Sequence, residues 1–231
     1  MQELKGRNLK QRVKKLLESS DFPASLQELR DVPPRKVINP LFSFLYHTND
    51  QVRWHAVTTM GIVVADLAEK DMESARVILR RLMWNLNDES GGIGWGSAEA
   101  LGEILACHKG LATEYANILL SYIQEDGNFQ EHGLMQRGVL WGIARLAQAR
   151  PELALDAVPH IMPFLASPDP AKRGLAARIM GLLCCGEARE PVLRLSDDES
   201  PFTTYLDGTL VQCSVKQMAE QALEKMKHPD T

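Results

Sequence analysis

Apolar and polar residues alternate along most of the chain with a period close to that of an α-helix. Four segments show the pattern most clearly and can be laid over one another: residues 52–65, 93–106, 133–146 and 172–185. Each has small or apolar residues at positions i, i+3, i+4 and i+7, which is the spacing of one helix face. We therefore predict an amphipathic helix in each segment.

The four segments also share a glycine at their tenth position. The spacings between these glycines are 41, 40 and 39 residues, and the residues are Gly61, Gly102, Gly142 and Gly181. A weaker fifth copy places Ala222 at the same position after another 41 residues. Glycine inside a helix costs about 1 kcal/mol relative to alanine, so a repeated glycine indicates a shared structural reason. Close packing against a neighbouring helix is the simplest one.

Partner helices are predicted between these segments, at residues 33–46, 72–86, 112–124, 151–166 and, shortened, 187–195. The linkers carry capping and turn residues such as Asn49 and Asp169. A helix pair about every 40 residues, with no strand-like alternation in the body, predicts an all-α fold. The expected architecture is an α-solenoid of about five helix pairs over residues 33–227.

Two stretches resemble a known repeat family. They are LFSFLYHTNDQVRWHAVTTMG and LASPDPAKRGLAARIMG, and the other two copies match more loosely. The sequence resembles the HEAT repeat family, an armadillo-like fold, in its short bacterial form called PBS-lyase-like HEAT repeats. The resemblance implies that the second helix of each pair lines a concave face, the usual binding surface. It says little about function, because such scaffolds serve many roles.

The N-terminal residues differ from the rest in charge. The first 36 residues carry 9 Lys and Arg against 5 Asp and Glu, a net charge of +4, whereas the remainder carries −8. We predict basic N-terminal cap helices over residues 1–32, with an apolar stripe that includes Leu9 and Val13 facing the first repeat. A basic patch for an acidic partner or nucleic acid, or a helix on a membrane surface, remains an alternative.

The C-terminal part breaks the helical pattern. Residues 202–213 are rich in β-forming residues around Asp207-Gly208, a dipeptide that tolerates the positive φ angles of a type I′ turn. We predict a small β-hairpin inserted into the solenoid, packed on the last repeat because a lone hairpin is marginally stable. A binding flap is the alternative. A last helix near residues 215–227 and a tail at 228–231 complete the chain.

The predicted partner-binding surface lies on the second helices. Trp is enriched at binding hot spots, but it is also an ordinary core residue. The tryptophans are therefore either part of the binding surface or part of the core. The charged residues of the second helices would line this surface. Alternatively, they lie on solvent-exposed helix faces or form salt bridges between repeats. The predicted set is Trp54, His55, Trp95, Glu99, Glu103, Arg137, Trp141, Arg145 and Arg178.

A glycine-rich stretch precedes one of these helices. Gly91, Gly92, Gly94 and Gly96 surround a predicted helix start, where free backbone N–H groups and absent side chains allow a ligand or partner to approach. Tight packing with a flexible turn is the alternative. No phosphate-loop lysine or preceding strand accompanies the glycines, so neither nucleotide-binding fingerprint is met.

Composition and motif spacing argue against several classes of protein function. The net charge of −4 disfavours a non-specific nucleic-acid binder, and no apolar run is long enough for a membrane helix. The four cysteines have no CxxC spacing, which is typical of a reducing cytoplasm and not of a disulfide scaffold. Neither HxxxH nor HExxH occurs, so we expect no metal site. The sequence offers no credible nucleophile or cofactor-binding loop, so we also expect no catalytic residues and no cofactor.

These features predict a non-catalytic scaffold or adaptor that binds a protein partner, and leave enzymatic activity open. One alternative is a HEAT-type enzyme or accessory that handles a tetrapyrrole, as bilin lyases do. A second resembles the HEAT-like DNA glycosylases, although the net −8 of the body disfavours a groove that follows phosphates. A small-molecule ligand and the oligomeric state also stay open.

Overall fold

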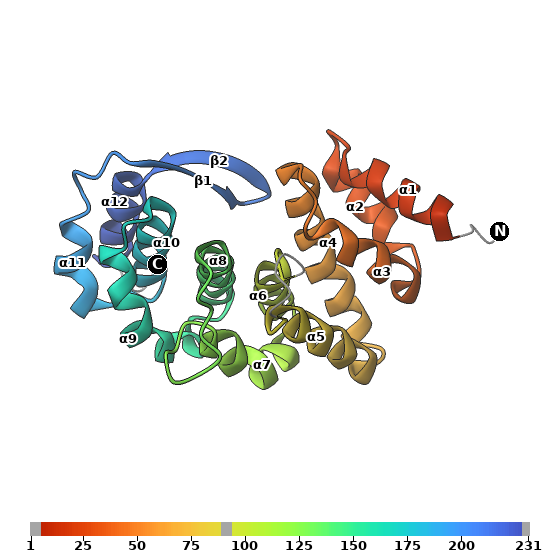
Figure 1. Ribbon diagram of the computed structural model, residues 1–231, viewed down its shortest axis with the longest axis horizontal. Coiled ribbons are helices and arrows are strands. Elements are labelled where there is room, and N and C mark those ends of the chain that lie inside the picture. The colour runs from red at the N-terminus through yellow and green to blue at the C-terminus, as the bar shows by residue number, and fades with distance from the viewer. Residues whose placement is uncertain (1–5, 89–93, 228–231) are drawn as a thin grey trace. The chain divides into compact units, whose positions relative to one another are not determined.

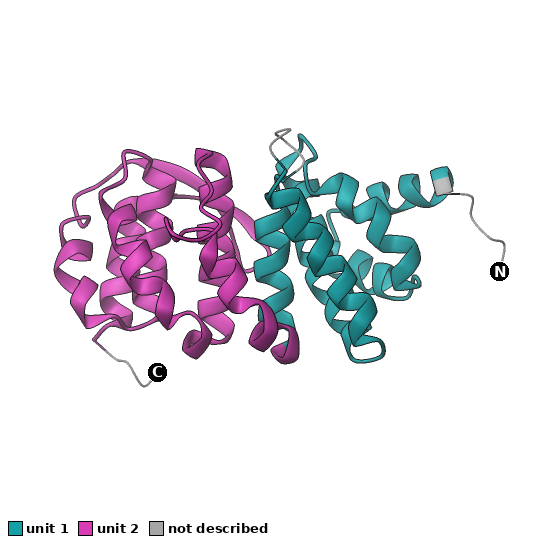
Figure 2. Ribbon diagram, turned by 60° about the horizontal axis from the view of Figure 1, so that its bottom comes forward, with its two compact units in different colours: residues 1–108 teal, residues 109–231 magenta. Residues whose placement is uncertain are grey.

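The computed structural model describes residues 6–88 and 94–227, and most of them lie in helices (Figure 1). The chain divides into two compact units, residues 1–108 and residues 109–231 (Figure 2). Each unit has its own core, so we describe the two in turn.

Unit 1 is helical throughout its described part. Its helices are α1 (Gly6–Leu17), α2 (Phe22–Arg30), α3 (Pro34–Phe44), α4 (Asp50–Ala68), α5 (Met72–Leu86) and α6 (Ser97–Cys107). Helix α4 packs against α3, α5 and α6, while α1 packs against α2 and α3. The helix starts are fixed by side-chain caps: Asn49 accepts a hydrogen bond from the Val52 N–H, and Asp71 accepts one from the Ser74 N–H.

Apolar side chains from every helix meet in the core of unit 1. Val13, Leu29, Leu41, Met60 and Leu101 are all fully buried. Because α1 and α2 contribute to this core, the N-terminal segment is held by the hydrophobic effect as well as by charge. One charged link is the double contact of the Arg30 guanidinium with the Asp66 carboxylate, at 2.8 and 3.0 Å.

Unit 2 combines helices with a short hairpin. Its elements are α7 (Lys109–Ser121), α8 (Gly133–Ala149), α9 (Val158–Ile161), α10 (Pro170–Leu182), α11 (Arg189–Leu193), β1 (Pro201–Leu206), β2 (Thr209–Ser214) and α12 (Val215–Lys225). Helix α10 packs against α8, α12 and β1. Helix α12 begins with a reciprocal cap between Ser214 and Gln217.

The segment at 151–166 is not the continuous helix that the sequence pattern predicts. It consists of 3₁₀ turns at Pro151–Leu153, Leu155–Ala157 and Met162–Ala166, with only α9 between them. The physical reason is the two prolines at positions 159 and 163, each of which removes an N–H donor and clashes with the preceding turn. The apolar face nevertheless stays inside, because Ala154, Ala157, Ile161 and Leu165 are buried.

The hairpin has the predicted position and turn. β1 and β2 pair antiparallel with Leu206 opposite Thr209, and Asp207 and Gly208 between them have φ angles of 48° and 85°. Both angles lie in the left-handed region that a type I′ turn requires. The Phe202 ring of β1 lies directly against Gly174 of α10, so the hairpin packs onto the helices of unit 2.

Two of the four aligned glycines confirm the reason inferred for them. A Cβ at Gly61 would come within 3 Å of the Glu103 side chain of α6, and one at Gly181 would lie 2.6 Å from the Ala222 Cβ of α12. Gly181 and Ala222 occupy the same position in successive copies of the repeat. At Gly61 and at Gly181, this position therefore lies against a closely packed neighbouring helix.

Candidate functional site

In unit 1, two residues of the predicted surface interact with the same arginine side chain. The Arg53 guanidinium of α4 lies over the Trp54 ring, 5.0 Å from its centroid. The same guanidinium reaches α6, where its Nη1 lies 3.4 Å from Oε1 of Glu99. Arg53 also pairs with Asp50 at 3.0 Å. The structure thus joins Trp54 and Glu99 through Arg53, which was not in the predicted set.

The Glu99 carboxylate lies on the inside of this group. The residue is only 7% exposed. Burial raises its pKa, and the charge of Arg53 acts in the opposite direction. Glu103, one turn further along α6, packs against Gly61 and accepts a contact from the Cys107 thiol at 3.7 Å.

His55 lies away from this group, in the core of unit 1. Its imidazole stacks on the Phe22 ring with centroids 3.7 Å apart, and its Nδ1–H donates to the Leu17 carbonyl at 2.8 Å. Burial lowers its pKa, and the bond to the Leu17 carbonyl opposes that shift. The structure therefore places this residue between α4 and the N-terminal helices.

Trp54 and Trp95 share a repeat position but differ in environment. Trp54 is within α4 and is 6% exposed, whereas Trp95 lies in the turn before α6 and is 43% exposed. The difference arises because Gly96 has a φ of +75° and the helix begins only at Ser97. Within the described part of the aligned segment, residues 94–106, the helix therefore begins at Ser97.

The glycine-rich stretch is partly described. Gly91 and Gly92 lie outside the described residues, and Gly94 is buried. At Gly96 a Cβ would collide with the backbone carbonyl of Leu45, which follows α3. The close approach that glycine permits here is therefore made by the chain's own backbone.

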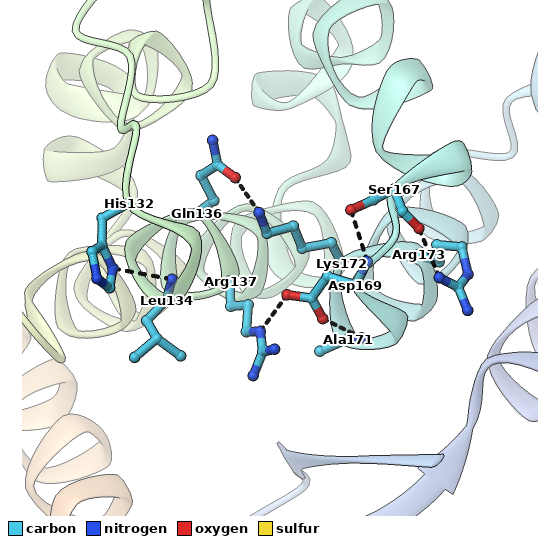
Figure 3. Close-up of polar contacts among 9 residues, drawn as sticks. All are labelled: His132, Leu134, Gln136, Arg137, Ser167, Asp169, Ala171, Lys172 and Arg173. Atoms are coloured by element: carbon cyan, nitrogen blue, oxygen red, sulfur yellow. Dashed lines mark hydrogen bonds and ion pairs between the residues drawn. The ribbon is translucent and has the colours of Figure 1, made fainter. Parts of the chain in front are cut away.

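In unit 2, polar side chains connect the first turns of α8 and α10 (Figure 3). The Arg137 Nε donates to Oδ2 of Asp169 at 2.6 Å, while the other oxygen of Asp169 caps α10 through the Ala171 N–H. The Lys172 ammonium donates to the Gln136 side chain. Arg137, with its side chain 45% exposed, both joins two helices and reaches solvent.

Trp141, Arg145 and Arg178 lie on the helices that the hairpin meets. The buried Trp141 donates its Nε1–H to the Tyr205 carbonyl of β1 at 2.7 Å, and the two rings are tilted with centroids 6.4 Å apart. Arg178 is half-buried and interacts electrostatically with Arg145 and with Asp207 at the hairpin turn. The structure therefore brings these predicted residues of α8 and α10 together beside β1 and β2.

Trp84, the most exposed tryptophan of the described residues, is absent from the predicted binding surface. Trp84 of α5 is 73% exposed, and Val77, seven residues earlier on the same helix face, is 53% exposed. The signal was present, because Val77 lies between the buried Ala75 and Ile78, and Trp84 lies between the buried Leu82 and Leu86, in an otherwise regular pattern. Scattered large apolar residues on the solvent side of a helix are common, so these two do not by themselves mark a binding surface.

Among residues 6–88 and 94–227, no three His, Cys, Asp or Glu side chains are grouped so that they could hold a metal ion. No helix in that part of the chain has the length and hydropathy needed to span a bilayer.

No family model matches the chain. A curated relative is an uncharacterized protein from Archaeoglobus fulgidus, which is 29% identical over 136 residues. The match covers 57% of this chain and 61% of that protein, so the chain matches less than two thirds of its relative's length.

Solved structures of designed repeat proteins share the fold. An engineered protein matches with a TM-score of 0.54 and 18% identity, covering 95% of this chain and 96% of its own. A designed armadillo repeat protein matches with a TM-score of 0.52 and 17% identity, covering 94% and 99%. Another, in complex with the peptide (KR)4, matches with a TM-score of 0.52 and 15% identity over 94% and 99%. The chain therefore has an armadillo-like helical repeat fold.

Proposed function

We propose that this protein is a non-catalytic scaffold or adaptor of the HEAT-repeat type, which binds a segment of a protein partner on its second helices. The observation that carries the proposal is the stripe of side chains along α8 at Leu134, Arg137, Arg145 and Gln148; Trp141 lies on the same helix face but is buried against Tyr205. Spacings of three and four residues put them on one helix face. Leu134 is 48% exposed and Arg137 is 45% exposed at its side chain, so the stripe offers both apolar and charged contacts.

Two further findings support the proposal. A repeat fold presents long surfaces whose individual residues can change without loss of the core. A designed armadillo repeat protein with the same fold is solved in complex with a peptide, which demonstrates this use of the architecture in that protein. The setting we propose is the cytoplasm, because Cys107, Cys184, Cys185 and Cys213 are all free thiols.

A peptide selection tests the proposed function. The full chain is immobilised and used to select binders from a displayed library of random dodecapeptides. Selected peptides are then measured against Leu134→Asp, on the stripe of α8, and against Trp84→Ala, on the exposed face of α5. We expect the first variant to lose at least tenfold in affinity and the second to lose less than twofold. The opposite result, or a library without binders, would refute this binding surface.

The two enzymatic alternatives have their own tests. A bilin or haem titration that shifts the absorption spectrum would favour tetrapyrrole handling over a protein partner. A gel shift with duplex DNA at low salt would favour the glycosylase-like alternative. We expect no shift of the absorption spectrum and no gel shift, because the proposed ligand of the second helices is a protein segment and not a tetrapyrrole or DNA.

A further inference from the structure

The hydrogen-bonding order of the β1–β2 hairpin (Figure 1) follows from contacts at both of its ends. Just beyond the strands, the Val215 N–H donates to the Ser200 carbonyl at 3.2 Å, so these residues continue the ladder as a hydrogen-bonded pair. In an antiparallel ladder such pairs alternate with pairs whose backbone groups point away from the partner strand. This count makes Tyr205 outward-facing, in agreement with its carbonyl accepting the Trp141 Nε1–H at 2.7 Å.

On β2 the same count assigns outward-facing backbone groups to Leu210 and Gln212. β2 pairs with β1 alone in the described part of the chain, and no backbone hydrogen bond to another segment there involves either residue. Both residues are exposed, Leu210 to 36%. The next outward position differs, because the Ser214 N–H donates to the Gln217 side chain at 2.9 Å. We call the backbone groups of Leu210 and Gln212, two donors and two acceptors, the β2 edge.

The β2 edge lacks the features that usually prevent the addition of a strand. Proteins protect exposed edges with charged side chains, prolines, bulges or a covering element. Residues 209–214 contain no charged residue and no proline, and they pair with β1 in six consecutive pairs without a bulge. The β1 side of the hairpin is different, because β1 packs on α10 and its Tyr205 carbonyl is bound by Trp141. A strand can therefore add at β2.

The end of the β2 edge that leads into α12 has acidic surroundings. The Lys216 N–H donates to the Asp198 carbonyl at 2.8 Å, which places the acidic run at residues 197–199 beside the first turn of α12. The carboxylates at 198 and 199 pair with Arg173 at 2.7 Å and with the Lys216 ammonium at 2.8 Å. The exposed Glu220 lies one turn after Lys216 on α12. Four carboxylates thus accompany two cations here, and cationic side chains on a bound segment would be attracted.

We propose that the β2 edge binds an extended segment of a partner protein as a third, antiparallel strand, uncharged where it pairs and basic where it passes α12. The two residues opposite Leu210 and Gln212 would form four backbone hydrogen bonds, since each such pair exchanges both of its bonds. The residue between them would lie beside the half-buried Val211. An antiparallel segment runs from α12 toward the hairpin turn, so its basic residues come first. This surface adds to the α8 stripe and does not depend on it.

A basic partner segment fits this edge better than a second copy of the chain. Two β2 strands related by a two-fold axis would pair Leu210 of one copy with Gln212 of the other, with Val211 at the centre. The exposed Asp207 lies four residues before that centre, so it would come opposite the start of α12 in the other copy, beside the same acidic group. Repulsion between these carboxylates opposes such a dimer.

Fluorescence anisotropy with labelled hexapeptides and the full chain at 0.15 M salt tests the proposal. The probe is Lys-Lys-Thr-Val-Thr-Gly, blocked at both ends. Its valine is meant to lie beside Val211 and its lysines beside α12. One comparison peptide, Glu-Glu-Thr-Val-Thr-Gly, reverses the charge, and another, Thr-Val-Thr-Gly-Lys-Lys, moves the lysines to the other end. We expect the probe to bind at least tenfold more tightly than either comparison peptide.

N-methylation of the probe tests the backbone hydrogen bonds on the unmodified protein. The N–H groups of both threonines would point at the β2 edge, whereas the N–H of the valine would point to the other side. Methylation of either threonine nitrogen should therefore weaken binding at least tenfold. Methylation of the valine nitrogen is the matched control and should change the affinity by less than threefold.

Protein variants locate the site. Gln212→Pro removes the outward N–H of the edge and leaves the ladder with β1 intact, whereas Gln212→Thr changes only the side chain. We expect at least a tenfold loss of affinity in the first and less than a twofold change in the second. Glu220→Gln should weaken binding at least threefold. Glu190→Gln makes the same change in net charge on α11, where the side chain is 78% exposed, and should stay within twofold. Far-UV circular dichroism confirms that each variant is folded.

Several outcomes would overturn the proposal. They are no binding of the probe, equal losses on methylation of the threonine and valine nitrogens, equal effects of Glu220→Gln and Glu190→Gln, or tighter binding of the peptide with C-terminal lysines. Sedimentation velocity that shows a dimer of the unmodified chain, abolished by Gln212→Pro, would assign the edge to a second copy. Leu134→Asp should bind the probe within twofold of the unmodified protein, which keeps this test separate from that of the α8 stripe.

Discussion

Replacement of Gly181 by alanine is expected to destabilise unit 2, although alanine favours helices. A Cβ at this position would lie 2.6 Å from the Cβ of Ala222 and closer still to its Cα, whereas ordinary contacts begin near 3.4 Å. The obstructing atoms include backbone of α12, so no side-chain rotation can relieve the overlap. Helix α12 must move away from α10 to accommodate the methyl group.

The two effects can be compared in magnitude. Overpacking of a well-packed interface costs about 1–3 kcal/mol, and movement of a whole helix places this site near the upper value. Glycine to alanine inside a helix returns about 1 kcal/mol. We therefore expect Gly181→Ala to lower the free energy of unfolding by about 1–2 kcal/mol.

Urea titration followed by circular dichroism measures this change, with a constant slope m showing that the same transition is compared. Gly186→Ala is the matched control, because a Cβ at Gly186 meets no atom within 4 Å; it should change stability by less than about 0.5 kcal/mol. In the Gly181→Ala background, Ala222→Gly should recover part of the loss, since it removes one of the overlapping atoms. A stabilised Gly181→Ala variant, or strictly additive effects at positions 181 and 222, would refute the reasoning.

Three other predictions concern buried side chains. Trp141→Ala should lower the free energy of unfolding by about 3–5 kcal/mol because Trp141 is buried, whereas Trp84→Ala should lower it by less than about 0.5 kcal/mol because Trp84 is exposed. Equal losses of stability in urea titrations would contradict this difference in burial. Because burial lowers the pKa of His55 from 6.5, the unfolded chain binds its proton more readily, and stability should fall as the pH drops below that value. His55→Gln should make thermal melts between pH 7.5 and 5 less dependent on pH. Because burial raises the pKa of Glu99 from 4.5, the folded chain holds that proton more tightly, and stability should fall as the pH rises above 4.5. Glu99→Gln should flatten this slope in urea titrations at successive pH values, and an unchanged slope would contradict the raised pKa.

Much of the fold could be predicted from helical periodicity. α5 begins and ends where the apolar pattern placed it, and the β-forming residues around Asp207-Gly208 located the hairpin. The aligned glycines revealed close helix packing, because a repeated cost in helix propensity needs a compensating contact. The breaks at 151–166 were not predicted, because the buried residues keep a helical spacing on both sides of the prolines at 159 and 163.

The site was less accessible to sequence reasoning. Register alone assigned Trp54 and Trp95 the same role, and only the backbone at Gly96 separates their exposures. The partner of Glu99 could not be found from spacing, because Arg53 lies 46 residues away on another helix. The Trp141 contact depends on how the hairpin packs, and no local pattern encodes that position.

The broken segment at 151–166 has a consequence for how unit 2 opens. Its short turns lack the continuous i to i−4 ladder that protects helical amides from solvent, and side chains such as Ile161 hold it to the core. Backbone amides there should exchange with deuterium sooner than those of the adjacent helices. Limited proteolysis of the native protein would then cut first in this stretch, before α8 or α10 loosens.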